Sequence, residues 1–210
     1  CPAPTNDQPR IEAQRLADEI AAHLAPRSNA YHDVWLNGEK LSPDAEQSEG
    51  VEPIYGKVYL PRKFKAAVGL PYDNCVDIYA QDLGFLAAVE NGRTVGYNVL
   101  VGGGFGRTSG NANTFPHLGQ ALCFVEPSEV VAASEAVIKF FRDHGNRADR
   151  KRARIKYVIH DWGIEKVRTV FQRDYWSKPL QMPRELPITA TDLRCEFRSE
   201  PLGVDEARPR

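Results

Sequence analysis

The sequence lacks several features that mark metal-binding, membrane and secreted proteins. Its four cysteines, Cys1, Cys75, Cys123 and Cys195, lie too far apart for the short Cys–x–Cys spacings of zinc or iron–sulfur sites. We interpret them as free, buried thiols. No apolar run approaches the roughly 20 residues of a membrane span, and the first residues lack the basic and then apolar pattern of a secretory signal. We therefore expect a cytoplasmic protein that contacts no membrane.

Net charge is also nearly absent. The formal charge is −1, from 27 basic and 28 acidic residues. Such a chain has no overall excess of positive charge with which to hold nucleic acid, so any anion site must be built locally. The sequence shows no serine, histidine and aspartate arrangement typical of a nucleophilic triad, and its 5 histidines have no metal-ligand spacing. Hydrolase chemistry is therefore disfavoured.

The length of 210 residues and the apolar fraction of 42% suit one domain with a hydrophobic core. We expect residues 1–190 to form a single domain and residues 191–210 to be a linker-like tail. The chain begins at Cys1 rather than at methionine and ends in a polar stretch. We interpret both ends as cuts in a longer polypeptide.

Hydrophobic periodicity predicts an α+β fold. Helical spacing of apolar residues predicts helices over residues 9–25, 127–144, 148–159 and 163–175. Alternation of apolar and polar residues predicts strands over residues 63–68 and 76–80, and two further strands, 83–90 and 93–101, flank the hairpin dipeptide Asn91-Gly92. We expect a mixed, mainly antiparallel sheet of about four to five strands with the helices packed on it.

Two segments of the predicted sheet could carry chemistry. Lys63 and Lys65 share one face of a strand, within about 7 Å of each other, and Arg62 precedes them. They are either solvated lysines or the walls of an anion site. The run Gly102-Gly103-Gly104 ends a strand and enters a loop whose backbone could approach a flat or anionic ligand closely. It does not continue into the Gly-Lys-Ser/Thr of a phosphate loop, and it is equally compatible with a plain flexible loop.

A third segment is strongly basic. Six cationic side chains lie within ten residues: Arg147, Arg150, Lys151, Arg152, Arg154 and Lys156. If this segment were one helix, three of them would share a face. The run is compatible with a solvated helix face, with a nucleic-acid patch, or with a clamp for a ligand that carries many carboxylates, and charge alone favours the solvated face.

The order of these motifs resembles one known family. Residues 60–65 (LPRKFK), 90–92 (ENG), 95–104 (VGYNVLVGGG) and 145–151 (GNRADRK) are similar, in this order, to the siroheme-dependent sulfite and nitrite reductases. The resemblance begins near residues 1–4 (CPAP) and continues through 153–157 (ARIKY) and 163–166 (GIEK). It therefore spans nearly the whole chain.

The resemblance implies an internal domain of a sulfite reductase hemoprotein, with the fold of the siroheme and iron–sulfur domain. Such enzymes pass six electrons to sulfite, or to nitrite in the alternative branch, through a siroheme coupled to a four-iron cluster. By motif match, Lys63 and Lys65 would be the catalytic residues, which attract the anion and supply protons. Siroheme would be bound by residues from three segments: Arg62, Gly102, Gly103, Gly104, Asn146, Arg147, Arg154 and Lys156.

The chain also departs from the family. The closely spaced cysteine pairs that hold the cluster are absent from these 210 residues. We therefore expect the chain alone to bind neither cluster nor siroheme and to be inactive. Its expected partners are the substrate anion, the rest of the same hemoprotein, and a flavoprotein or ferredoxin as electron donor. Two other interpretations stay open: a nucleic-acid-binding domain, and a domain of this family that has lost catalysis.

Overall fold

The computed structural model describes residues 8–27, 35–37, 39–40 and 51–186. Its centre is a sheet of four strands in the order β3 (Ala66–Gly69), β4 (Leu83–Glu90), β5 (Arg93–Val101) and β6 (Gln120–Val125). Strand β3 runs parallel to β4, whereas the β4–β5 and β5–β6 pairs are antiparallel. The predicted mixed, mainly antiparallel sheet is therefore confirmed. The short strands β1 (Trp35–Leu36) and β2 (Glu39–Lys40) pair with each other.

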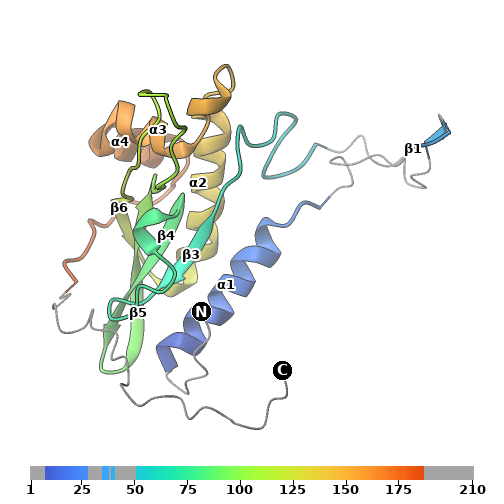
Figure 1. Ribbon diagram of the computed structural model, residues 1–210. Coiled ribbons are helices and arrows are strands. Elements are labelled where there is room, and N and C mark those ends of the chain that lie inside the picture. Colours follow the sequence, from blue (N-terminus) through green and yellow to red (C-terminus); the bar gives the residue numbers. More distant parts are fainter. Residues whose placement is uncertain (1–7, 28–34, 38, 41–50, 187–210) are drawn as a thin grey trace, which may run out of the picture.

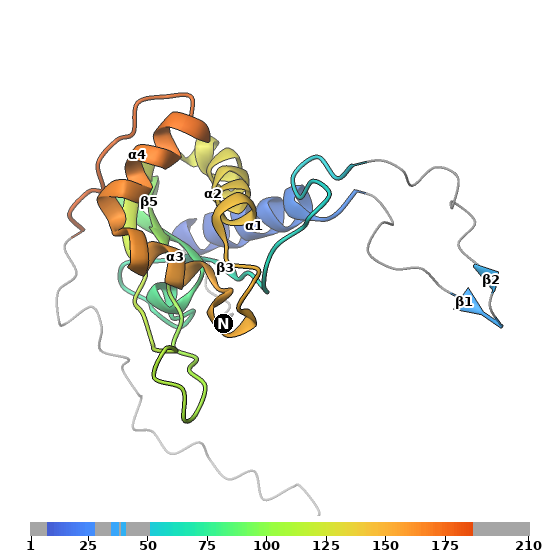
Figure 2. The ribbon, with the colours of Figure 1, turned by 90° about the horizontal axis from the view of Figure 1, so that it is seen from above.

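Four helices accompany this sheet in the described part of the chain: α1 (Gln8–Leu24), α2 (Val130–His144), α3 (Ile155–Trp162) and α4 (Ile164–Asp174). Figures 1 and 2 show α1 and α2 side by side along the sheet. Helices α3 and α4 lie near the edge of the sheet that β6 forms. The main core joins helix residues such as Phe141 to alternate strand residues such as Phe85 and Val99. The intervening residues Leu86 and Leu100 face the other side.

The connection from β3 to β4 covers that other side of the sheet. Ile78, in this connection, packs with Leu86 and Leu100 in a separate small cluster. A parallel strand pair needs a long crossover, and here the crossover is a loop with one 3-10 turn rather than a helix. The predicted strand over residues 76–80 is therefore wrong.

Local hydrogen bonds explain that correction. The side chain of Asn74 accepts a bond from the backbone N–H of Ile78 (2.9 Å), and the side chain of Asp73 accepts one from that of Cys75 (3.0 Å). Asp77 adopts a left-handed conformation with φ 49°. Short polar side chains thus satisfy the backbone locally and compete with strand pairing.

The predicted helix over residues 148–159 is also corrected, because α3 begins only at Ile155. The Asn146 side chain accepts bonds from the N–H groups of Ala148 and Asp149, and the Asp149 carboxylate accepts one from Lys151. These turns end in a short 3-10 segment at Arg150–Arg152. The basic run therefore does not share one helical face.

Other predictions are confirmed. Asn91 and Gly92 have positive φ values of 50° and 73°, and Glu90 pairs with Arg93 across a two-residue hairpin turn. The helices predicted over residues 9–25, 127–144 and 163–175 correspond to α1, α2 and α4. Strand β6 was not predicted.

The prediction of buried cysteine thiols is right for one of the two described cysteines and wrong for the other. Cys123 is buried, as predicted, and burial raises the pKa of its thiol to about 12. Cys75 is exposed, so the prediction of a buried thiol is wrong there. Cys1, Cys195 and the predicted tail at 191–210 lie outside the described residues. Among the residues that are described, no helix is long and apolar enough to cross a membrane.

Candidate functional site

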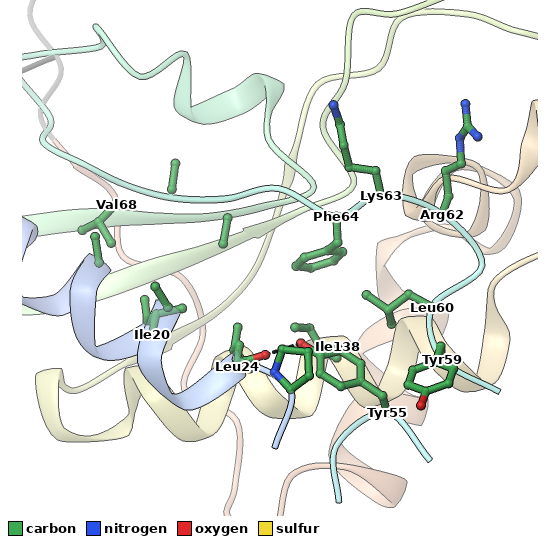
Figure 3. Close-up of a pocket in the computed structure, with 15 residues that line it drawn as sticks. Ile20, Leu24, Tyr55, Tyr59, Leu60, Arg62, Lys63, Phe64, Val68 and Ile138 are labelled. Carbon is green, nitrogen blue, oxygen red and sulfur yellow. Dashed lines mark hydrogen bonds between the residues drawn. The ribbon is translucent and has the colours of Figure 1, made fainter. Parts of the chain in front are cut away.

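The segment of residues 59–65 leads into β3 and carries the predicted catalytic lysines. Lys63 and Lys65 are exposed, whereas Phe64 between them is half-buried and its ring stacks on that of Phe141 at 5.7 Å. Figure 3 shows the side chains of Arg62 and Lys63 pointing to the opposite side of the segment from the Phe64 ring. Both lysines are therefore exposed, but they precede the sheet: the strand predicted over residues 63–68 begins only at Ala66 and ends at Gly69.

The side of the segment that carries Phe64 faces a cavity of about 560 Å³. Its lining is mainly apolar and comes from α1, α2, β3 and the chain before β3, as Ile20, Ile138, Val68 and Tyr55 illustrate in Figure 3. This cavity separates α1 from the lysine segment. Arg62 and Lys63 also contribute to its lining, but their charged ends point away from the Phe64 ring.

The first half of the lysine segment lies beside the predicted Asn146-Arg147 motif. The guanidinium of Arg147 donates from Nη2 to the carbonyl oxygen of Tyr59 (2.6 Å). A Cβ atom added at Gly145 would lie only 2.5 Å from Cγ of Pro61, so the two segments pack in close contact there. Asn146 uses its side-chain oxygen within its own turn, which leaves its amide N–H groups available as donors.

The second half of the segment is bound to a residue that sequence reasoning missed. The carboxylate of Asp82, immediately before β4, accepts a bond from the backbone N–H of Lys65 (3.0 Å). The same carboxylate accepts two bonds from Arg154, from Nε (3.0 Å) and from Nη2 (2.6 Å). Asp82 therefore joins the lysine segment to the start of α3. A single aspartate before an apolar strand has no sequence pattern that would reveal this role.

Burial raises the pKa of Asp82, while the guanidinium of Arg154 and the N–H of Lys65 oppose that shift. Three donors point at its two oxygens, an arrangement that suits the ionised, acceptor-only carboxylate. Arg154 uses one N–H of Nε and one of Nη2 in this pair, so three of the five N–H groups of a guanidinium remain as donors. Its side chain is 22% exposed. Arg154 can therefore bind Asp82 and a second anion at once.

Lys156 is held differently from the other cations. It is 1% exposed, and its ammonium donates to the backbone carbonyls of Gly104 (3.2 Å), Gly106 (2.7 Å) and Phe115 (2.6 Å). Burial lowers the pKa of this ammonium, and the charge of Arg154 lowers it further. An ammonium has three N–H donors, so all of them are used within the protein. The geometry favours a role for Lys156 in holding the loop after the glycine run.

The glycine run is required by the fold itself. Gly102 has φ +81°, and a Cβ atom there would lie 2.6 Å from Cγ1 of Ile159. A Cβ atom at Gly103 would lie 2.2 Å from the carbonyl oxygen of Tyr79. At Gly104 the nearest atoms would be Nη2 of Arg154 and Cδ of Lys156, both at 3.4 Å. Gly104 is therefore the glycine that brings the main chain against the cationic side chains.

These contacts bring most of the predicted site residues to one end of the sheet, around residues 59–65. Arg152, from the same basic run, instead bonds away from this segment. It forms an ion pair with Asp161 (2.7 Å) and stacks over Tyr157 (4.9 Å). Within residues 8–27 and 51–186, no group of three or more His, Cys, Asp or Glu side chains could hold a metal ion. The donors that remain are guanidinium and amide N–H groups, which suit the carboxylates of a ligand and are not ligands of an iron–sulfur cluster.

Comparison with known proteins shows which family the chain resembles. Residues 17–180 match the family described as "Nitrite and sulphite reductase 4Fe-4S domain". The sulfite reductase [NADPH] hemoprotein beta-component of Shewanella baltica is 47% identical over 165 residues, which are 79% of this chain and 29% of that protein. Its counterpart in Staphylococcus haemolyticus is 45% identical over 166 residues, 79% of this chain and 28% of that protein.

A solved structure shares the fold. The Mycobacterium tuberculosis NirA protein superposes with a TM-score of 0.58 at 25% sequence identity, over 87% of this chain and 27% of that one. The chain thus spans less than a third of the length of the relatives that it matches. Because the family match covers most of its length, the chain belongs to the nitrite and sulphite reductase 4Fe-4S domain family.

Proposed function

We propose that this chain is the part of a sulfite-reducing hemoprotein that binds the substrate anion and holds one side of a siroheme. The observation that supports this most is the position of residues 59–65. This segment presents Lys63 and Lys65 to solvent and contacts both the Asn146-Arg147 turn and, through Asp82, Arg154. Substrate-binding and cofactor-binding candidates from distant parts of the sequence thus meet at one end of the sheet.

In this proposal the two lysines bind sulfite and deliver protons to it. Their ammonium groups are compact, mobile charges, and two such charges held near each other repel unless an anion lies between them. Each S–O bond that breaks releases its oxygen as water, which consumes protons. A lysine ammonium hydrogen-bonded to that oxygen is a suitable proton donor, and such general acids typically contribute about 10²–10⁴-fold to rate.

The other residues bind the cofactor in the same proposal. Siroheme, coupled to a four-iron cluster, supplies the six electrons when it is bound, and the names of the relatives support an electron supply that begins at NADPH. Arg62, Asn146, Arg147 and Arg154 have donors suited to its carboxylates, and Gly104 lets the main chain approach the ring. Lys156 contributes by fixing the loop that follows Gly104.

Alanine substitutions test the role of the lysines in the complete hemoprotein. We expect Lys63→Ala and Lys65→Ala each to lower kcat/KM for sulfite, per bound siroheme, by at least about 100-fold. Their melting temperatures stay within about 1 °C of the parent protein, because both side chains are exposed. Lys57→Ala, at another exposed lysine just upstream, is the matched control and keeps full activity. Unchanged turnover in both site variants would end the assignment.

The same assay, run with nitrite, decides between the two substrates that the family description names. We propose sulfite because the two reported curated relatives are both named sulfite reductases. A higher kcat/KM for nitrite than for sulfite contradicts this choice. The cytoplasmic location and the identity of the electron donor remain predictions.

We further propose that the 210 residues alone bind neither cluster nor siroheme, because no group of three or more His, Cys, Asp or Glu side chains within the described residues could hold a metal ion. Anaerobic reconstitution with iron, sulfide and siroheme, followed by gel filtration and absorption spectroscopy, tests this directly. A siroheme absorption band that elutes with the protein contradicts the proposal.

A further inference from the structure

We propose that Asp82 is a positioning residue, which holds the Lys63–Lys65 segment at a fixed place relative to the glycine run and Arg154. The proposal rests on the function proposed above for the lysines. Asp82 touches no substrate in this arrangement. It acts through the main chain of Lys65 and through the side chain of Arg154.

The side chain of Asp82 bonds both to the main chain of the lysine segment and to the side chain of Arg154, the residue immediately before α3. One oxygen, Oδ2, accepts bonds from both the Lys65 N–H (3.0 Å) and Nη2 of Arg154 (2.6 Å). The other, Oδ1, accepts the bond from Nε of Arg154 (3.0 Å). The side chain is 1% exposed, so water does not substitute for these donors. The position of the Lys65 backbone therefore depends on this carboxylate.

Main-chain bonds around Asp82 extend the connection to the glycine run. The carbonyl oxygen of Asp82 accepts a bond from the N–H of Gly102 (2.9 Å), and that of Gln81 accepts one from Gly103 (2.9 Å). On the other side, the N–H of Leu83 donates to the carbonyl oxygen of Lys65 (3.0 Å). Residues 81–83 thus lie between the lysine segment and the glycine run and bond to both.

The position of Lys65 makes this contact important for the site. Lys65 precedes β3, whose pairing with β4 begins at Ala66 and Leu83. Its N–H therefore has no strand partner and depends on Asp82 instead. Without the carboxylate, the backbone that carries the Lys65 ammonium loses its fixed direction, although the strand after it stays paired.

Asp82→Asn removes the charge and one hydrogen-bond acceptor of the side chain while keeping its shape. One of the two terminal groups of asparagine is an NH₂ donor, which cannot accept a bond from Arg154 or Lys65. We therefore expect Asp82→Asn to break at least one of the three bonds. Asp161→Asn is the matched control, because Asp161 also accepts two bonds from one arginine, Arg152, and does not bond to the lysine segment.

Amide hydrogen exchange of the 210-residue chain, followed by NMR, measures positioning without any cofactor. In Asp82→Asn we expect the Lys65 amide to exchange at least tenfold faster, while the Val99 amide in the centre of the sheet changes less than threefold. Asp161→Asn changes both by less than threefold. Equal acceleration at Lys65 and Val99 indicates general destabilisation and overturns the proposal, as does an unchanged rate at Lys65.

A second variant covers the case in which Asp82→Asn does not fold. Arg154→Lys keeps a cation beside Asp82 but removes the two-pronged contact, and we expect the Lys65 amide to exchange at least threefold faster than in Asp161→Asn. A Lys65 amide that exchanges no faster than in this control overturns the proposal.

Kinetics of the complete hemoprotein, per bound siroheme, then separate this proposal from the function on which it rests. We expect Asp82→Asn to lower kcat/KM for sulfite at least tenfold in the parent protein and less than threefold in the Lys65→Ala background, because rates per bound siroheme leave out any loss of cofactor through Arg154 and report the effect through Lys65. Equal losses in both backgrounds overturn the positioning role alone. If Lys65→Ala itself has no effect, the proposed function of Lys65 fails, whatever the exchange data show.

Discussion

Replacement of Lys156 by methionine should destabilise the protein although it removes no apolar packing. Methionine keeps an unbranched, apolar side chain of similar length in a position that is 1% exposed. It deletes three bonds from the ammonium to the carbonyl oxygens of Gly104, Gly106 and Phe115. Hydrogen bonds to charged groups contribute about 1.5–3 kcal/mol each, so the gross loss is roughly 5–9 kcal/mol.

Part of that loss is recovered. The ammonium no longer has to be kept out of water, and this desolvation costs several kcal/mol per buried ion. Because residues 105–110 are exposed, water can also reach some of the released carbonyl groups. We therefore expect Lys156→Met to lower the free energy of unfolding by about 2–3 kcal/mol.

Urea denaturation of the 210-residue chain, followed by tryptophan fluorescence, measures this change. The control is Lys139→Met, on the surface of α2, where the lysine forms an i,i+4 pair with Glu135. We expect that control to cost less than about 0.5 kcal/mol. If Lys156→Met costs no more than the control, the ammonium does not hold the loop and the reasoning about Lys156 is wrong.

Three further predictions follow from the packing. Gly103→Ala should cost at least about 3 kcal/mol in urea denaturation, because its Cβ atom would meet two backbone carbonyl oxygens at 2.2 Å and 2.6 Å; Gly106→Ala, with no atom within 4 Å, should stay within about 0.5 kcal/mol of the parent. Phe141→Ala, at a fully buried ring, should cost about 3–5 kcal/mol in the same assay, and a loss below about 1 kcal/mol would show that the ring is not packed. The guanidinium of Arg142 holds the pKa of Asp143 below its usual value in the folded protein. The carboxylate therefore stabilises the fold fully at pH values above the ordinary aspartate pKa of about 3.9. This contribution disappears as the pH falls through the lower pKa of the folded state. Asp143→Asn should therefore be less stable than the parent at pH 6, by under about 1 kcal/mol since the group is part-exposed, and equally stable near pH 2; a pH-independent difference would contradict the assignment.

The helices and the hairpin could be predicted because their signals are local. Apolar residues at helical spacing marked α1, α2 and α4, and Asn91-Gly92 marked the turn between β4 and β5. The errors at residues 76–80 and 148–154 also have a local cause. There, side chains of Asn74 and Asn146 hydrogen-bond to the nearby backbone and override the apolar or helical pattern.

The candidate site was only partly predictable. Motif resemblance pointed to the lysines, the glycines and the basic segment, and alternation placed Lys63 and Lys65 on one face of a predicted strand, which in the structure begins only at Ala66. It did not distinguish Arg154, which keeps free donors, from Lys156, whose donors are all used by the loop. The charge of a residue does not reveal whether its N–H donors are already bonded within the folded protein.

The sequence by itself determined the family, the α+β class and the residue types that suit an anion and a carboxylate-rich ring. Only the tertiary structure decided which of them act together. Asp82 lies 17 residues from Lys65 and 72 residues from Arg154 in the sequence, and it connects the two only because β4 begins where the lysine segment and the start of α3 meet. The physical reason is burial: a carboxylate taken out of water must find donors wherever the chain provides them, and those donors come from segments far apart in the sequence.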